Sequence, residues 1–197
     1  MTTATPTVTS SITTDASWLL VPHPDEVDTA WRAETLELFD AVVRLDDERP
    51  EHRTDERLDT VAALDTLLAF RAGLGPGQWL VASLAVPGNW PLPVVVTVGL
   101  AEGGTTELLE LAGATGGLPI EPPSVDELPD HVGGEGPVVT RYDLDDDGAI
   151  WASVTAVRRA DGVDTHVLWR TTDLGLVPVF APLVVDLLAT VENEVHA

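Results

Sequence analysis

The chain has 197 residues, and its 33 acidic residues against 10 basic ones give a formal net charge of −23. Every basic residue is Arg, and a chain without Lys forms no lysine Schiff base and builds no P-loop, whose lysine holds nucleotide phosphates. Cys is missing too, which excludes thiol nucleophiles, disulfides and thiolate metal sites.

The N-terminal region combines a polar arm with a short strand. Residues 1–15 are rich in Thr and lack the basic start and apolar core of a signal peptide, so we expect a disordered arm on a cytoplasmic protein. The stretch ASWLLVP, residues 16–22, predicts a first strand that stops at the prolines of PHP. With a hydrophobic share of 44%, residues 16–197 are expected to form a single globular domain.

Two helices are predicted next, joined by the charged stretch 46–57 into a helical hairpin. The first begins at Asp25, with acids in its first turn, and its apolar residues share one face: Trp31, Leu38, Val42 and Leu45. The second covers about residues 55–72, and its expected inward positions are Leu58, Val61, Leu64, Leu68 and Ala72.

The stretch GLGPGQ, residues 73–78, has the glycine content of a dinucleotide-binding loop but the wrong context. Such a loop follows a strand and opens a helix, whereas this one follows a predicted helix and opens a predicted strand. It is therefore interpreted as a helix cap and a turn.

Two predicted strands, 78–86 and 93–101, flank the proline-walled turn PGNWPL. Two arrangements of its tip are open. Trp90 either folds back onto the domain or stays exposed, and in the second case Trp90 and Asn89 are candidate contacts for a protein partner.

The second half of the chain predicts a short helix at 106–114, a Gly- and Pro-rich loop at about 113–137, and three strands. The strands are 138–144, 149–159 and 164–172, separated by Asp147-Gly148 and Asp161-Gly162. These dipeptides favour tight turns, so the strands are expected to form an antiparallel meander.

The last segment predicts an amphipathic helix that covers a sheet. Its apolar residues recur at helical spacing: Phe180, Leu183, Val184, Leu187, Leu188, Val191 and Val195. The expected fold class is therefore α+β, an antiparallel β-sheet packed against an N-terminal helical hairpin and a C-terminal amphipathic helix.

The final strand and helix, THVLWRTTDLGLVPVFAPLVVDLLATV, resemble the Mog1/PsbP-like α+β domains of small bacterial accessory proteins. The resemblance covers about a seventh of the chain, concerns the fold and contains no functional motif. The predicted N-terminal helical hairpin is longer than in that pattern. The resemblance implies a binding or accessory role and no particular activity.

The stretch RYDLDDDGAIW, residues 141–151, is the sharpest motif in the chain. Asp143, Asp145 and Asp147 occupy the first, third and fifth positions of an EF-hand calcium loop, and Gly148 the sixth. The twelfth position is Val154, which offers no carboxylate, and the flanks alternate like strands. Two interpretations follow, a hairpin turn that is acidic like the whole chain and, less favoured, a calcium site.

The remaining polar residues form no specific catalytic pattern. His23, Asp25 and Glu26 are close enough in sequence to bind a metal together, but they also fit the first turn of a helix. His166 lies beside Asp164 without a serine elbow that would complete a catalytic triad. An arginine cluster suits either an anionic ligand or a network with the interleaved acids: Arg44, Arg49, Arg53 and Arg57.

The sequence thus predicts a non-enzymatic, acidic accessory or chaperone-like protein that binds a basic or amphipathic protein partner. Direct binding to nucleic acid or to a membrane is not expected, because the chain repels phosphates and lacks a long apolar segment. No cofactor is expected apart from the calcium alternative. Two other functions stay open, a hydrolase that uses carboxylates or a divalent metal, and a DNA mimic.

Overall fold

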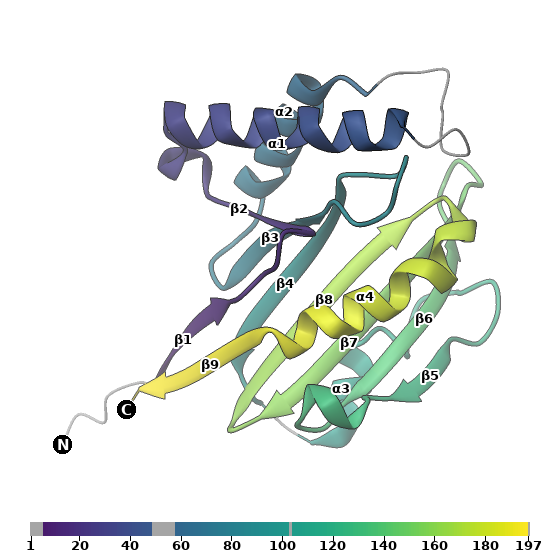
Figure 1. The fold of residues 1–197 in the computed structure, drawn as a ribbon. Coiled ribbons are helices and arrows are strands. Elements are labelled where there is room, and N and C mark those ends of the chain that lie inside the picture. Colours follow the sequence, from purple (N-terminus) through teal and green to yellow (C-terminus); the bar gives the residue numbers. More distant parts are fainter. Residues whose placement is uncertain (1–5, 49–57, 103, 197) are drawn as a thin grey trace. The chain divides into compact units, whose positions relative to one another are not determined.

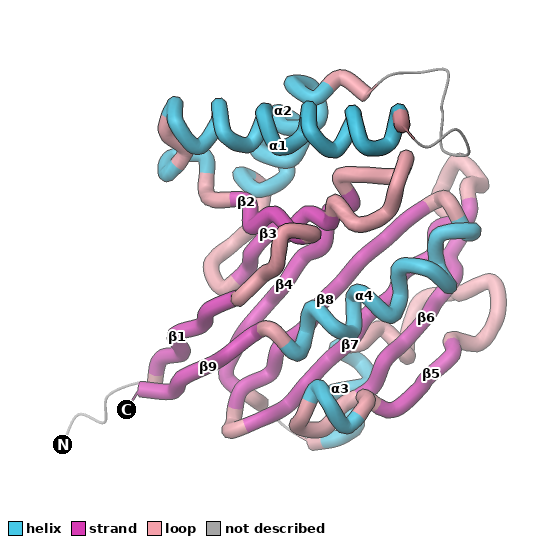
Figure 2. Tube along the Cα trace, in the orientation of Figure 1, coloured by secondary structure: helices cyan, strands magenta, loops and turns pink. Residues whose placement is uncertain are grey.

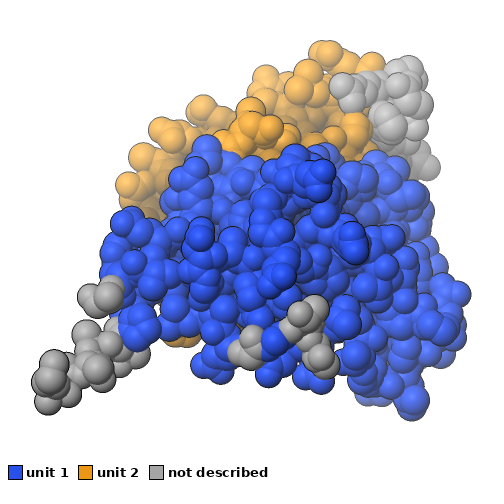
Figure 3. Space-filling view, turned by 90° about the horizontal axis from the view of Figure 1, so that it is seen from below, with its two compact units in different colours: residues 1–13, 94–197 blue, residues 14–93 orange. Residues whose placement is uncertain are grey.

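The structure, a computed structural model, describes residues 6–48, 58–102 and 104–196 (Figure 1). It confirms the α+β class, with an antiparallel sheet and a helix near the C-terminus. The chain divides into two compact units, which Figure 3 colours separately. Unit 1 comprises residues 1–13 and 94–197, and unit 2 comprises residues 14–93. The single domain expected for 16–197 stays a prediction of the sequence.

Unit 2 contains a strand pair and the predicted helical hairpin. Strands β2 (Trp18–Val21) and β3 (Gln78–Ser83) are antiparallel, and the short 3-10 helix η1 (Pro24–Glu26) follows β2. Helix α1 (Thr29–Asp47) packs on α2 (Thr60–Ala72), which in turn packs on β2 and β3. Asp28 and Asp59 cap the two helices by accepting hydrogen bonds from backbone N–H groups of their first turns.

The buried face of α1 is shifted by one position in the sequence relative to the predicted face. The buried residues are Thr35, Phe39 and Val43, whereas Leu38 and Leu45 are exposed. The predicted face left out Phe39, whose ring packs edge-on against Trp90 at 5.3 Å between centroids. The aromatic contact therefore sets the rotation of the helix.

Helix α2 begins later than predicted, at Thr60, and buries Leu64 and Leu67. Leu58, Val61 and Ala72 are exposed, so these three inward positions were predicted wrongly. Most of the charged connection, with Arg49, His52, Arg53 and Arg57, lies outside the described residues.

Unit 1 is built on a sheet whose strand order is β4-β8-β7-β6-β5, all antiparallel (Figure 2). The predicted meander is confirmed in β6 (Pro137–Leu144), β7 (Ile150–Ala160) and β8 (Val163–Thr171). Strand β4 (Leu92–Leu100) pairs with β8 from Val94 onward. A two-residue turn, Asp161-Gly162, joins β7 to β8 with positive φ at both residues, as the sequence indicated.

Helices cover both faces of this sheet. On one face, α4 (Val177–Ala189) packs on β7 and β8, and Phe180 meets Trp169 edge-on at 4.7 Å. On the other, α3 (Thr105–Leu111) contributes Leu108 to a buried cluster with Val139 and Val157. Val154 lies opposite Trp169 and therefore on the face that α4 covers. Val157 is three positions further along β7, so its side chain points to the opposite face.

The terminal helix is shorter than predicted. It ends at Ala189, and Val191 and Val195 belong to a further strand, β9 (Val191–His196). This strand pairs with β1 (Thr7–Ile12), which lies in the arm that was expected to be disordered along residues 1–15. Each of the two segments supplies the backbone partner that the other needs, an arrangement that the local pattern of neither segment reveals.

The Gly- and Pro-rich segment 113–137, which was predicted as a loop, contains regular secondary structure. It contains strand β5 (Ser124–Glu127) and the 3-10 helix η3 (Asp130–Val132). Strand β5 pairs with β6, from Ser124 opposite Thr140 to Glu127 opposite Pro137. None of the helices in the described residues combines the length and apolarity needed to cross a membrane.

Candidate functional site

The three aspartates of the calcium-like motif have different surroundings. Arg141 holds Asp143 through both carboxylate oxygens, with N–O distances of 2.7 to 2.9 Å. Asp145 accepts hydrogen bonds from the N–H groups of Asp147 and Ala149, at 3.0 and 2.8 Å. Within the described residues, no three His, Asp or Glu side chains gather closely enough to hold a metal ion. Calcium binding therefore stays a prediction of the sequence alone.

Asp145 stabilises the hairpin between β6 and β7. Its carboxylate also accepts a hydrogen bond from the Trp151 indole at 3.0 Å. These donors, the indole first, lower the pKa of Asp145 below its usual value. The loop spans residues 145–149, one residue longer than the connection expected between strands 138–144 and 149–159, and Gly148 has a φ of 81° that suits glycine.

Trp90 takes the first of the two arrangements that the sequence left open. It folds back within unit 2, is 7% exposed, and donates its indole N–H to Asp46 at 2.7 Å. Asp46 also accepts the backbone N–H of Gly88, so one carboxylate fixes both sides of the turn. Asn89 is exposed beside it. This geometry gives Trp90 a structural role and does not support it as a partner contact.

The four histidines within the described residues do not gather at one site. His23 caps η1 as part of a capping box with Glu26, which accounts for the HPDE stretch without a metal. His131 lies 3.0 Å from Asp186, and His196 lies 3.1 Å from the hydroxyl of Thr9. His166 is on β8, opposite Val157 and Thr97 in the neighbouring strands.

Strand β5 offers backbone hydrogen-bonding groups at the end of the sheet order. Leu128 donates its N–H to the carbonyl of Gly136 at 3.1 Å, in register with the β5–β6 pairing. Because such groups alternate along an antiparallel strand, Ser124 and Asp126 also face β6, and Val125 and Glu127 direct their N–H and C=O groups away from it. All four residues of β5 are exposed.

A groove of about 540 Å³ lies within unit 1 among α3, β5 and residues 134–137, which pair with the end of β5. Its apolar side is formed by Leu108 and Leu109 of α3 together with Val125 and Leu128. On the remaining side the backbone of Gly134 passes so close to β7 that a Cβ atom there would lie 2.7 Å from the carbonyl oxygen of Arg159. Glycine at this position therefore allows the wall of the groove to form.

The groove is acidic. Its charged lining residues are Asp126, Glu127 and Glu135, and it contains no arginine. The chain has neither Arg nor Lys between Arg71 and Arg141, so the segment that supplies the groove also lacks nearby cations in sequence. An exposed strand, an apolar wall and three carboxylates thus occur together, and of these three only Glu135 lies opposite an arginine, Arg159.

Sequence reasoning missed this site because it treated 113–137 as a loop. Two signals point to it in retrospect, the alternation of SVDEL between two proline-containing stretches and the long gap in basic residues. The alternation indicates a strand, and the gap in basic residues indicates that this strand lies in an acidic segment. The groove itself depends on α3 and β5 lying side by side, which neither signal shows.

Comparisons with known proteins assign no family. No family model and no curated protein matches the chain. A crystal structure of a protein from Bacteroides thetaiotaomicron VPI-5482 matches with a TM-score of 0.37 and 11% identity. The match covers 61% of this chain and 40% of that one, so the chain spans less than half the length of that protein. At these values the likeness carries no argument about fold or function.

Proposed function

We propose that the protein is a non-enzymatic accessory protein that binds a short, basic, extended segment of a partner protein along β5. The observation that carries the proposal is the exposed edge of β5 beside an apolar and acidic groove. Main-chain hydrogen bonds supply affinity when a peptide adds to a sheet edge, and pockets for alternate side chains supply specificity. A cytoplasmic location remains a prediction of the sequence.

The site favours a particular pattern in the bound segment. Residues opposite Val125 and Glu127 would pair through the outward N–H and C=O groups and share their face of the sheet. An aliphatic residue suits the position opposite Val125, where Leu108 and Leu109 form the wall. Lys or Arg suits the positions opposite Asp126 and Glu127, because each then meets a carboxylate. The net charge of −23 would also attract such a segment at long range.

Prolines on both sides limit the length of the segment. Pro122 and Pro123 precede β5, and Pro129 follows Leu128. Proline has no N–H to donate, and natural sheets use it to stop edge-to-edge pairing. The edge therefore accepts a few residues of a partner and does not extend into open-ended sheet growth.

The test is calorimetric titration of the full chain with a blocked hexapeptide of sequence Gly-Lys-Lys-Val-Thr-Gly. We expect saturable one-to-one binding that weakens as salt is raised, and at least a tenfold loss when Glu replaces both Lys residues. Absence of saturable binding would overturn the proposal. The salt dependence follows from the surface location of the carboxylates.

A variant pair separates strand addition from general attraction to an acidic protein. Val125→Pro removes an N–H that faces away from β6, and so deletes an outward hydrogen bond without breaking the β5–β6 ladder. We expect it to weaken peptide binding at least tenfold, whereas Val125→Thr, which keeps the N–H, stays within about threefold of the wild type, roughly 0.7 kcal/mol at 25 °C. Equal binding by both variants would show diffuse electrostatic attraction and would contradict the proposal.

A further inference from the structure

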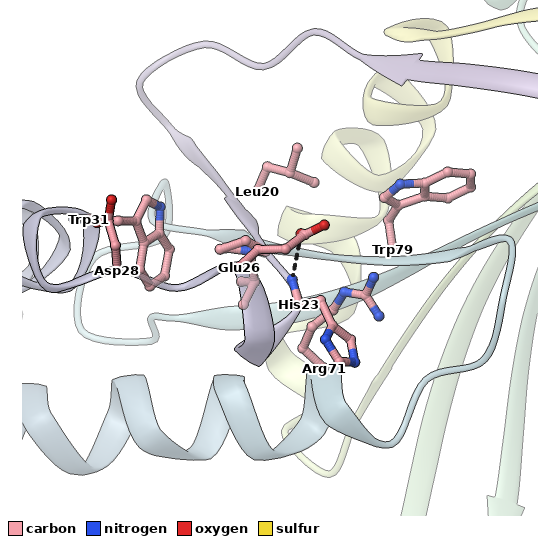
Figure 4. Close-up of a pocket in the computed structure, with 9 residues that line it drawn as sticks. Leu20, His23, Glu26, Asp28, Trp31, Arg71 and Trp79 are labelled. Carbon is pink, nitrogen blue, oxygen red and sulfur yellow. Dashed lines mark hydrogen bonds between the residues drawn. The ribbon is translucent and has the colours of Figure 1, made fainter.

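Unit 2 contains a pocket of about 560 Å³ that the proposed function does not use. It lies among the end of β2, the turn and η1 that follow, the first turn of α1, the last turn of α2 and the start of β3. This volume is within the usual range for sites that hold a small molecule. Figure 4 shows the side chains around it, with Arg71 and Trp79 toward one end and Asp28 and Trp31 toward the other.

Arg71 is the unusual residue of this pocket. Its Nε atom is buried and has no hydrogen-bond partner in the structure. Two arginines of unit 1, Arg141 and Arg159, form ion pairs with aspartates at 2.7 and 2.6 Å. Arg158 shares the unpartnered, buried Nε, but it donates through its terminal nitrogen to the carbonyl of Val191 at 2.6 Å. In unit 2, Arg32 pairs with Asp65 at 2.7 Å. Buried donors normally have partners, so Arg71 presents a cation for which the described residues supply no anion.

The two carboxylates of the pocket, Glu26 and Asp28, each accept one backbone hydrogen bond. Glu26 accepts the backbone N–H of His23 at 3.2 Å, and Asp28 accepts the backbone N–H of Trp31 at 2.7 Å. Neither forms an ion pair with Arg71 within the part of unit 2 that the structure describes. Each of these hydrogen bonds uses one carboxylate oxygen and leaves the second available to a ligand. Figure 4 shows Asp28 beside Trp31 at one end of the pocket and Glu26 between that end and Arg71, so the pocket presents separate cationic and anionic groups along its length.

The walls between these ends are apolar and aromatic. Trp31 and Trp79 are half-buried, Leu20 and Val21 of β2 add apolar surface, and Pro22 and His23 also line the pocket. Half-buried indoles provide flat surfaces for the body of a ligand and attract an ammonium group placed over a ring face. Trp31 follows Asp28 by three positions, donates its backbone N–H to it and lies at the same end of the pocket, so the aromatic and anionic contributions reinforce each other there.

We propose that this pocket binds a small zwitterion, with a carboxylate on the guanidinium of Arg71 and an amino or quaternary ammonium group near Glu26, Asp28 and Trp31. A simple anion would match Arg71 but would meet two carboxylates and a net charge of −23. A simple cation would leave Arg71 without a partner. A zwitterion satisfies both ends and carries no net charge against the field of the protein.

The experiment is calorimetric titration of the full chain, at near-physiological salt, with ω-amino acids from glycine to 6-aminohexanoate and with their N-trimethyl forms. Hexanoate and hexylamine serve as single-charge analogues. We expect saturable binding by at least one zwitterion of the series, at least tenfold tighter than by either analogue. The absence of saturable binding across the series would overturn the proposal, and so would a zwitterion that binds no more tightly than hexanoate.

Variants of the same chain locate the site. Arg71→Met keeps the apolar stem and removes the guanidinium, so binding should fall at least tenfold while the melting temperature stays equal or rises. Arg32→Met removes an arginine that is paired outside the pocket and should leave binding unchanged. Full retention of binding by Arg71→Met would overturn the proposal.

Glu26→Gln keeps the capping geometry and removes one negative charge, so it provides a second test if Arg71→Met does not fold. It should reduce the preference for the zwitterion over hexanoate at least threefold, and an unchanged preference would contradict the role of the anionic end. The pocket and the β5 groove lie in different units, so failure of the peptide titration leaves this result independent.

Discussion

At the scale of single residues, His166 is expected to make the stability of the fold depend on pH. Its Nε2 atom is buried without a hydrogen-bond partner, and burial lowers the pKa of the imidazole from its usual 6.5. Its cross-strand neighbours, Val157 and Thr97, do not titrate, and the acid two positions away, Asp164, pairs with Arg159 at 2.6 Å. The folded protein therefore takes up this proton less readily than the unfolded chain does.

The sign of the effect follows from linkage. Below about pH 6.5 the unfolded chain binds a proton that the folded chain resists, so His166 destabilises the fold progressively as pH falls through this window, by at most about 1.4 kcal/mol per pH unit. Above the unfolded pKa it has no such effect. We expect His166→Leu to reduce the loss of stability between pH 7 and pH 5.5, measured by urea unfolding of both proteins. Parallel pH profiles would contradict this expectation, and the carboxylates common to both proteins provide the internal control.

The roles of individual residues could be predicted only in part from the sequence. The hairpin at 141–151 was predicted because Asp and Gly favour turns, and the structure has strands on both sides of it. Sequence alone could not distinguish Asp143, which pairs with Arg141, from Asp145, which organises the turn. That distinction depends on which face of the strand each side chain occupies and on what folds against it. Arg71 received no role at all, because a missing partner becomes visible only in three dimensions.

At the scale of elements, α4 is expected to carry much of the stability of unit 1. Leu188 is completely buried, whereas Val179 on the same helix is 58% exposed. Leu188→Ala should lower the free energy of unfolding by about 2–5 kcal/mol through lost burial and a residual cavity. Val179→Ala, the matched control, should change it by less than about 1 kcal/mol. Chemical denaturation measures both, and equal effects would mean that the face of α4 carrying Leu188 does not pack on the sheet as described.

Element types were easier to predict than their ends and partners. The helical period of α4 and the β-branched residues of β6, β7 and β8 are local signals, and they gave the correct elements. Val191 and Val195 continue the helical spacing but lie in β9, because β1, more than 170 residues away in the sequence, supplies a strand for them. Periodicity describes one segment and cannot show a distant partner. The β5 groove was missed for the same reason, since it requires α3, β5 and residues 134–137 together.

At the scale of the whole molecule, the balance of charge is the dominant property. The chain has 33 acids and 10 arginines, so even complete pairing of the arginines leaves a net charge of −23. Within the described residues, several arginines are committed to local structure, including Arg32, Arg141 and Arg159 in ion pairs and Arg170 over the ring of Trp151 at 5.0 Å. Few cations are therefore left to offset the repulsion among the acids.

This imbalance predicts that monovalent salt stabilises the folded protein. At about 0.01 M salt the screening length is about 30 Å, comparable to a small domain, whereas at about 0.5 M it falls below about 8 Å. The repulsion among distant acids is then removed, while close, partly buried pairs such as Arg159–Asp164 keep most of their attraction. Each kcal/mol of relieved repulsion should raise the melting temperature by about 2–4 °C for a chain of this length. A melting temperature that climbs with sodium chloride and then levels off would support screening, since exclusion of salt from the surface gives a continuing rise. A melting temperature that falls with salt would mean that local ion pairs outweigh the net charge.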